Sequence, residues 1–188
     1  NHLIRKITSG GVVTTLAGTG SSGSANGTGT AASFYHPYGV AVDGSGNVYV
    51  ADRANHLIRK ITSGGVVTTL AGSGSSGSTN GTGTAASFNR PADVAVDGSG
   101  NLYVADYNNH LIRKITSGGV VTTLAGSGSS GSANGTGTAA SFNGPSGVAV
   151  DGSGNVYVAD DSNHLIRKIV TTLASGSTTN DATLPLIF

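Results

Sequence analysis

The chain repeats itself every 54 residues, and this repeat limits its possible folds more than any other feature. The hexapeptide Asn-His-Leu-Ile-Arg-Lys starts at Asn1, Asn55, Asn109 and Asn163. Repeats of roughly this size are typical of solenoids and propellers, because one small unit cannot bury its apolar face alone and stacks on the next. Three periods occupy residues 1–162 of the 188, and the fourth copy is incomplete.

Within one period, four short apolar runs alternate with turn sequences. In the stretch 93–125 these runs are 94–96, 102–105, 110–115 and 120–124. The residues between them are mostly Gly, Asn, Asp and Ser, which suit tight turns. The pattern predicts a four-stranded antiparallel meander, whose strands we call a, b, c and d in chain order.

A stretch rich in Gly, Ser and Thr, residues 126–142 in one copy, joins strand d to the next strand a. Its composition suits a flexible linker, but its length is constant and each copy ends in Phe shortly before Pro. A four-stranded sheet of this size is too small to be stable alone. We therefore expect Phe34, Phe88 and Phe142 to insert between neighbouring sheets, and we predict an all-β β-propeller with one sheet per blade.

The repeated residues resemble NHL repeats. The resemblance rests on the Asn-His-Leu triplet, on the run Val-Ala-Val-Asp-Gly-Ser-Gly-Asn-Val-Tyr-Val-Ala-Asp and on the Pro before strand a, and it extends to about Ala174. It implies a propeller, commonly of six blades, whose channel faces bind peptides, proteins, RNA or carbohydrate. It also implies that a minority of such proteins are enzymes.

One chain is too short for a closed ring of six such blades. It holds three a–b pairs, starting near Val40, Val94 and Val148. About three isolated blades would leave two open flanks, which favour association. We therefore predict a homodimer in which two half-rings close a six-bladed ring by two-fold symmetry.

The expected division of the chain follows from this arrangement. Residues 1–17 form an orphan c–d pair, which we expect to complete a blade of the partner by strand exchange. Blade 1 with its preceding loop occupies residues 18–71, blade 2 occupies 72–125 and blade 3 occupies 126–174, and a tail follows at 175–188.

The fourth c–d copy differs from the others because it lacks the Thr-Ser-Gly-Gly turn, so that Ile169 runs directly into Val170. Without this turn the c–d hairpin cannot form in its usual register, which favours exchange of residues 1–17. Two alternatives stay open: the strand from His164 remains local and only strand d is exchanged, or the chain is part of a longer array.

Only nine of the 54 columns differ among the three full copies, which indicates recent duplication or deliberate engineering. Six of the nine change charge, size or aromaticity, and they lie in the d–a connection or the b–c turn. These two connections share one end of an up-and-down blade. The residues of these columns that we expect to bind a ligand, called the variable-loop face, are Tyr35, His36, Tyr38, Arg53, Asn89, Arg90, Asp93, Tyr107, Asn108, Asn143, Ser146, Asp161 and Ser162.

A diversified face on a fixed scaffold predicts a binding surface, because Tyr supplies rigid contact area and polar residues supply adaptable hydrogen bonds. Drift at exposed turns is the competing interpretation, but the a–b and c–d turns do not vary although they are turns as well. We expect a non-catalytic scaffold that binds itself and a protein, peptide or glycan. The first alternative is a carbohydrate-binding propeller that stacks sugar rings on Tyr35, Tyr38 or Tyr107.

The second alternative is a lyase-type enzyme with a metal in the channel, for which only His36, Asp93 and Asp161 are available on this face. We expect no cofactor and no metal, because Cys is absent and equivalent His residues on separate blades point to different places. With a net charge of +1 and no long apolar run, we expect neither nucleic acid nor a membrane as a partner.

Four residues that recur in every repeat receive structural roles. His56 and its copies are expected to hold a turn or a strand start. Asp43 begins Asp-Gly-Ser-Gly-Asn, which we interpret as a hairpin turn because it lacks the further carboxylates of a calcium loop. The side chain of Asp52 is expected to cap the b–c turn by hydrogen bonds to the backbone of that turn. The Arg-Lys pair at Arg59 is expected to lie on a solvated rim of the blade.

Overall fold

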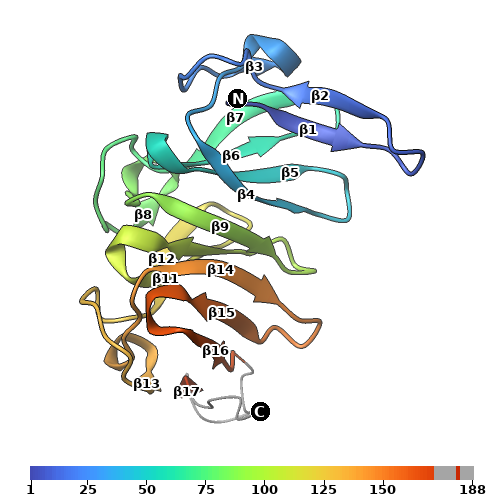
Figure 1. Cartoon of the computed structure of the whole chain (residues 1–188). Helices are drawn as coiled ribbons and strands as arrows, with labels where there is room; N and C mark the ends of the chain where they lie inside the picture. The colour runs from blue at the N-terminus through green and yellow to red at the C-terminus, as the bar shows by residue number, and fades with distance from the viewer. Residues whose placement is uncertain (172–180, 183–188) are drawn as a thin grey trace.

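The computed structural model of the chain describes residues 1–171 and 181–182. Apart from single turns of 3-10 helix, every regular element in these ranges is a β-strand, as predicted. The sheets follow one another along an arc, from the N-terminal hairpin to the third blade (Figure 1). Within the same ranges no helix is long and apolar enough to cross a membrane.

Two blades have the predicted order a, b, c, d, joined by tight hairpin turns. The strands of blade 1 are β4 (Pro37–Val42), β5 (Val48–Asp52), β6 (Leu57–Ile61) and β7 (Val66–Ala71). The strands of blade 2 are β9 (Pro91–Val96), β10 (Leu102–Asp106), β11 (Leu111–Ile115) and β12 (Val120–Ala125).

Blade 3 contains strands a, b and c, which are β14 (Pro145–Val150), β15 (Val156–Asp160) and β16 (Leu165–Ile169). β16 pairs with β15 in the register that the other blades use. Strand c of the fourth copy therefore stays local, as one of the two alternatives left open above has it, because the missing turn comes only after this strand. The copy of strand d continues into residues outside the described ranges.

The N-terminal hairpin consists of β1 (Ile4–Ile7) and β2 (Val13–Ala17), which correspond to strands c and d without their a and b. It packs against blade 1 through Ile4, Ala17 and Phe34, which are all buried. β15 is already paired on both sides, by β14 and β16. Exchange of a partner's hairpin onto β15 would therefore require β16 to leave.

The Gly-rich connection before each blade is an ordered part of the sheet and not a loose linker. β3 (Gly27–Thr28) adds a fifth strand to β7, and β8 (Gly81–Thr82) does the same at β12. β13 (Gly135–Thr136) pairs with β17 (Asp181–Ala182) in a separate two-stranded sheet. The sequence did not predict these strands, because two residues carry no hydrophobic periodicity.

The three Phe side chains lie between neighbouring sheets, as predicted. Phe88 is fully buried and packs with Ala51 and Ile58 of blade 1 and with Val104 and Ile115 of blade 2. Phe34 and Phe142 hold the same position in the clusters on either side. Burial of a large aromatic side chain at each joint therefore stabilises the attachment of one blade to the next.

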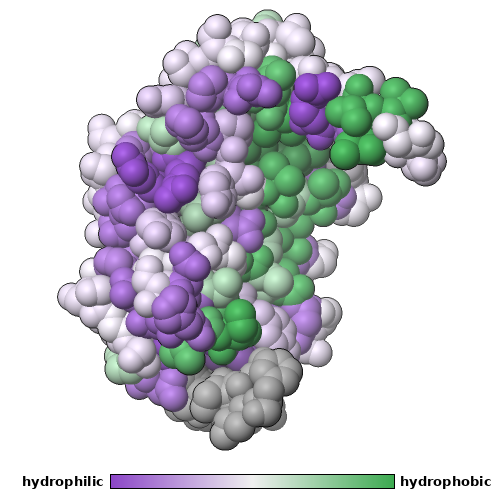
Figure 2. Space-filling view, viewed as in Figure 1, coloured by the Kyte–Doolittle hydropathy of each residue, from purple (hydrophilic) through white to green (hydrophobic). Residues whose placement is uncertain are grey.

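Both ends of the arc expose side chains that are buried in its middle. Val94 of blade 2 is 2% exposed, whereas its equivalent Val40 of blade 1 is 52% exposed. At the other end, Ile166 of blade 3 is 50% exposed, whereas its equivalent Ile112 is fully buried. Figure 2 shows hydrophobic residues gathered over the N-terminal hairpin and the strands beside it. Each flank therefore lacks the neighbour that the inner blades have.

Candidate ligand-binding face

The d–a and b–c connections of each blade lie together at one end, as predicted. In blade 2 the backbone N–H of Asn108 donates to the carbonyl of Asn89 at 3.0 Å, and the bond recurs in the other two blades. The b–c turns are 3-10 turns, namely η2 (Arg53–Asn55), η4 (Tyr107–Asn109) and η6 (Asp161–Asn163). The variable columns thus share one face, and backbone contacts hold them there.

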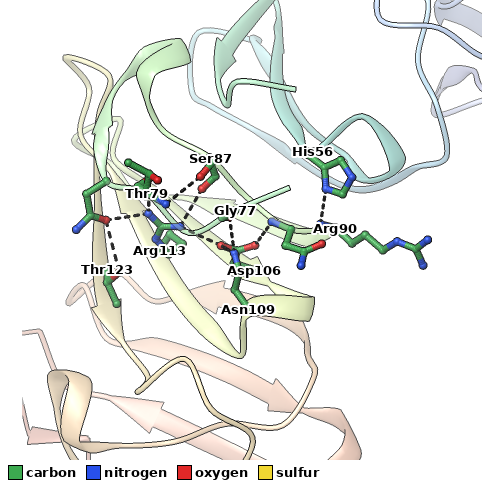
Figure 3. A network of polar contacts seen from close by, with 11 residues as sticks. His56, Gly77, Thr79, Ser87, Arg90, Asp106, Asn109, Arg113 and Thr123 are labelled. Atoms are coloured by element: carbon green, nitrogen blue, oxygen red, sulfur yellow. Dashed lines mark hydrogen bonds and ion pairs between the residues drawn. The ribbon is translucent and has the colours of Figure 1, made fainter. Parts of the chain in front are cut away.

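Below this face, each blade holds a buried ion pair. Arg113 on β11 donates to Asp106 on β10 at 3.0 Å, and both side chains are fully buried. The same guanidinium donates to the carbonyls of Ser87 and Thr79, each at 3.1 Å (Figure 3). It also lies over the ring of Phe88. The expectation of a solvated arginine rim is therefore wrong for Arg59, Arg113 and Arg167, because carbonyls from the preceding loop bind each of these three guanidinium groups. Arg5 of the N-terminal hairpin is exposed, as expected.

Asp106 ties two connections together. Its Oδ1 accepts the backbone N–H of Asn89 at 2.7 Å, and its Oδ2 accepts the side-chain amide of Asn109 at 2.8 Å. Burial raises the pKa of Asp106 to about 6, against the lowering effect of these hydrogen bonds and of Arg113. The expectation that this aspartate caps the backbone of the b–c turn is therefore wrong. Its carboxylate binds the backbone of the d–a connection, and in the b–c turn it binds only the side chain of Asn109.

The Asn-His-Leu triplet holds successive blades together. His110 adopts the left-handed conformation at φ 55°, and its Nδ1 accepts the backbone N–H of Gly144 in the next blade at 3.0 Å. His56 accepts from Arg90 in the same way at 3.1 Å. The structural role expected for these histidines is confirmed, and it explains why Asn109 and His110 recur as a pair.

A cavity of about 390 Å³ opens between blades 1 and 2 on the variable-loop face. Its lining consists of Tyr35, His36, Tyr38, Arg53, Ala54, His56 and Arg90. Five of these seven are predicted site residues. His56 was not predicted to contribute, although its place opposite the variable residue Arg90 follows from the inter-blade hydrogen bond.

Arg53 is fixed by aromatic rings. Its guanidinium carbon lies 5.0 Å from the ring centroid of Tyr38 and 4.9 Å from that of Tyr107. Its Nε is buried and has no hydrogen-bond partner among the described residues. Beside it, Tyr35 and His36 pack their rings at 5.0 Å. The cavity therefore has a wall of aromatic rings with a guanidinium held against it.

Asp93 lies on the same face but packs between strands a of neighbouring blades. Its carboxylate accepts the backbone N–H groups of Val94 at 2.9 Å and Val148 at 3.0 Å. Burial raises the pKa of Asp93, although these bonds oppose the change. A Cβ at the equivalent Gly39 would come within 2.6 Å of the Cα of Asp93. Gly39 and Asp93, which hold the same repeat position in neighbouring blades, are therefore in contact, and a side chain at one limits the space at the other.

The other predicted residues lie outside the cavity. Asn89 and Asn108 contact each other through their side chains at 3.5 Å, and Asn143 donates its backbone N–H to Asp160. Ser146, Asp161 and Ser162 belong to blade 3 and do not line the cavity. Within residues 1–171, no three His or Asp side chains gather as a metal site would require.

The chain contains three NHL repeats, since the NHL repeat family model matches residues 34–61, 88–115 and 142–169. NHL repeat-containing protein 2 of Gallus gallus is 42% identical over 80 residues. That match covers 42% of this chain and 11% of the chicken protein. The chain therefore spans a small part of this relative.

Solved structures share the fold over about three blades. A structural-genomics protein of unknown function from Bacteroides thetaiotaomicron VPI-5482 superposes with a TM-score of 0.74 at 28% identity, over 89% of this chain and 42% of that one. Virginiamycin B lyase from Staphylococcus aureus superposes with a TM-score of 0.57 at 16% identity, over 90% and 46%. This chain is equivalent to somewhat less than half of each.

Proposed function

Because the chain is built from three NHL repeats, we propose that it is a non-catalytic binding module whose ligand is held on the variable-loop face. The scaffold beneath that face is nearly identical in all repeats. The repeated ion pair, Phe insertion and His contact hold the loops in place from blade to blade. A rigid scaffold that presents variable loops is the usual arrangement of a binding surface.

The observation that carries this proposal is the cavity between blades 1 and 2. Its volume of about 390 Å³ lies within the range of small-molecule sites. Tyr35, His36, Tyr38, Arg53 and Arg90 line it, and all five vary among the repeats. Two tyrosines and two arginines around one hollow favour binding over drift at exposed turns.

An array of immobilised glycans and short peptides tests the proposal. We expect the wild-type protein to bind a subset of the array and the double variant Tyr35→Asn, Tyr38→Ala to lose that binding. These changes install the residues that blade 2 carries at the same positions. Ser99→Ala, at the opposite end of blade 2, is the control and should bind as the wild type does. Absence of wild-type binding, or equal binding by the double variant, would refute the proposal.

A second function, self-association into a closed ring, is supported by the two uncovered flanks. Val40 and Ile166 are half exposed at positions where the inner blades are buried. Apolar side chains that a like neighbour covers elsewhere in the chain favour a second copy as the cover. We propose that two chains close a ring through these flanks and complete the variable-loop face.

A further inference from the structure

The charge of the cavity between blades 1 and 2 is unbalanced. Arg53 and Arg90 both line it, and no Asp is among its lining residues. Neither arginine forms an ion pair within the described ranges, whereas Arg59, Arg113 and Arg167 are all paired with Asp. Burial and then the charge of Arg90 lower the pKa of His56. The hollow is therefore positive and lacks a counter-charge from the residues around it.

Arg53 is preorganised to receive an anion. Tyr38 and Tyr107 hold its guanidinium at about 5 Å from their ring centroids. A planar guanidinium offers parallel N–H donors to a carboxylate, and a fixed one loses less entropy on binding. A ligand group that accepts two parallel hydrogen bonds would therefore match the guanidinium of Arg53.

The same cavity offers aromatic surface. Tyr38 is 64% exposed and Tyr35 is 40% exposed, so that both rings remain available. The negative face of an aromatic ring attracts the positive C–H edges of a ligand. The backbone N–H groups of His36 and Arg90 are already bound by His2 and His56. An extended peptide, which is held mainly by backbone hydrogen bonds to a free strand, therefore finds little to bind here.

We infer that this cavity binds a carbohydrate that carries a carboxylate, such as a uronic or sialic acid residue. Arg53 and Arg90 bind the carboxylate, and Tyr38 and Tyr35 contact the face of the sugar ring. This inference rests on the proposed binding function and adds the class of ligand to it.

Calorimetric titration tests the inference with trigalacturonate, a glucuronate oligosaccharide and a sialyl oligosaccharide, each compared with its neutral methyl ester. We expect at least one acid to bind about tenfold or more tightly than its ester, because a hydrogen-bonded charge is lost in the ester. We expect Arg53→Gln and Arg90→Gly each to weaken that binding by a similar factor. The second change is compatible with the backbone, since Gly144 holds the equivalent position at φ 61°.

Arg5→Gln is the matched control, because Arg5 is exposed on the N-terminal hairpin, outside the cavity. It should leave the affinity unchanged, and circular dichroism should show all variants folded. Equal affinity for acid and ester, or unchanged affinity in Arg53→Gln and Arg90→Gly, would overturn the inference. So would tighter binding of triglutamate, which would indicate an acidic peptide. In each case, array binding that depends on Tyr35 and Tyr38 would still support the proposed function.

Discussion

Single residues in this chain act through partners that are distant in sequence. Arg113 and Lys114 are adjacent and both basic, yet Arg113 is fully buried and Lys114 is partly exposed over the ring of Tyr103. Sequence patterns could not distinguish them, because both faces of a blade are covered and the strand period therefore carries no information. The carbonyls of Thr79 and Ser87 decide which one is buried, and they come from the loop before the blade.

Removing one partner of this ion pair should be costly. We expect Arg113→Ala to lower the free energy of unfolding by about 3–5 kcal/mol, because it leaves the carboxylate of Asp106 buried without its cation. Urea unfolding followed by circular dichroism measures the change. Arg5→Ala is the control, since Arg5 occupies the same repeat position but is exposed, and we expect it to change stability by less than about 0.5 kcal/mol. Similar losses in both variants would contradict this account.

The coupling between Gly39 and Asp93 predicts an asymmetric response to the same substitution. A Cβ on Gly39 would meet the Cα of Asp93 at 2.6 Å and the carbonyl oxygen of Ala92 at 2.8 Å. A Cβ on the equivalent Gly147 would meet nothing closer than the Cβ of Ala159 at 3.3 Å. We expect Gly39→Ala to destabilise the protein by about 1–3 kcal/mol and Gly147→Ala to have a smaller effect. Thermal unfolding of the two variants compares them, and a larger loss at Gly147 would disprove the coupling.

At the scale of elements, turn chemistry was the most predictable part of the fold. The Asp-Gly-Ser-Gly-Asn segments form a–b hairpin turns, as expected. Asp97 shows how: its Oδ1 accepts the backbone N–H groups of Ser99 and Asn101, each at 2.9 Å. The two-residue strands β3 and β8 were not predicted, because they form only where the loop before a blade meets the outer strand of that blade, β7 or β12.

The turn aspartates should give a pH dependence of known sign. Although burial acts in the opposite direction, hydrogen bonds from Asn101, Ser99 and Tyr103 hold the pKa of Asp97 below its usual value of 3.8. A carboxylate with a lowered pKa in the folded state stabilises it above about pH 4, and this contribution is lost as pH falls. We expect the difference in urea midpoint between wild type and Asp97→Asn to shrink between pH 5 and pH 2.5. Taking this difference cancels the other carboxylates, and a constant difference would rule out the effect.

At the scale of the whole molecule, the repeat count predicted three blades along an arc, since each blade is a local unit stacked on its neighbour. It did not decide what happens at the two ends, because every repeat carries nearly the same residues whether or not a neighbour covers them. Ile112 and Ile166 both stand in the sequence Asn-His-Leu-Ile-Arg-Lys-Ile, yet Ile112 is fully buried and Ile166 is half exposed. Whether the ring closes thus depends on what covers the two flanks, and the repeated sequence does not encode this locally.

The two flanks provide a complementation test of ring closure. We expect the wild type to have a mass in light scattering near twice 18.4 kDa, and we expect Val40→Asp and Ile166→Asp each to reduce it to that of one chain. Each variant damages one side of both joints in a two-fold ring, because a charge placed in an apolar joint is not compensated. In an equimolar mixture, the Ile166→Asp chain still carries Val40 and the Val40→Asp chain still carries Ile166. One of the two joints in a mixed dimer therefore has both apolar sides intact, so dimers should reappear. Val94→Asp should instead unfold the chain, because Val94 is buried within it. A wild type that remains monomeric, or a mixture that stays monomeric when each single variant is folded, would show that these flanks do not meet.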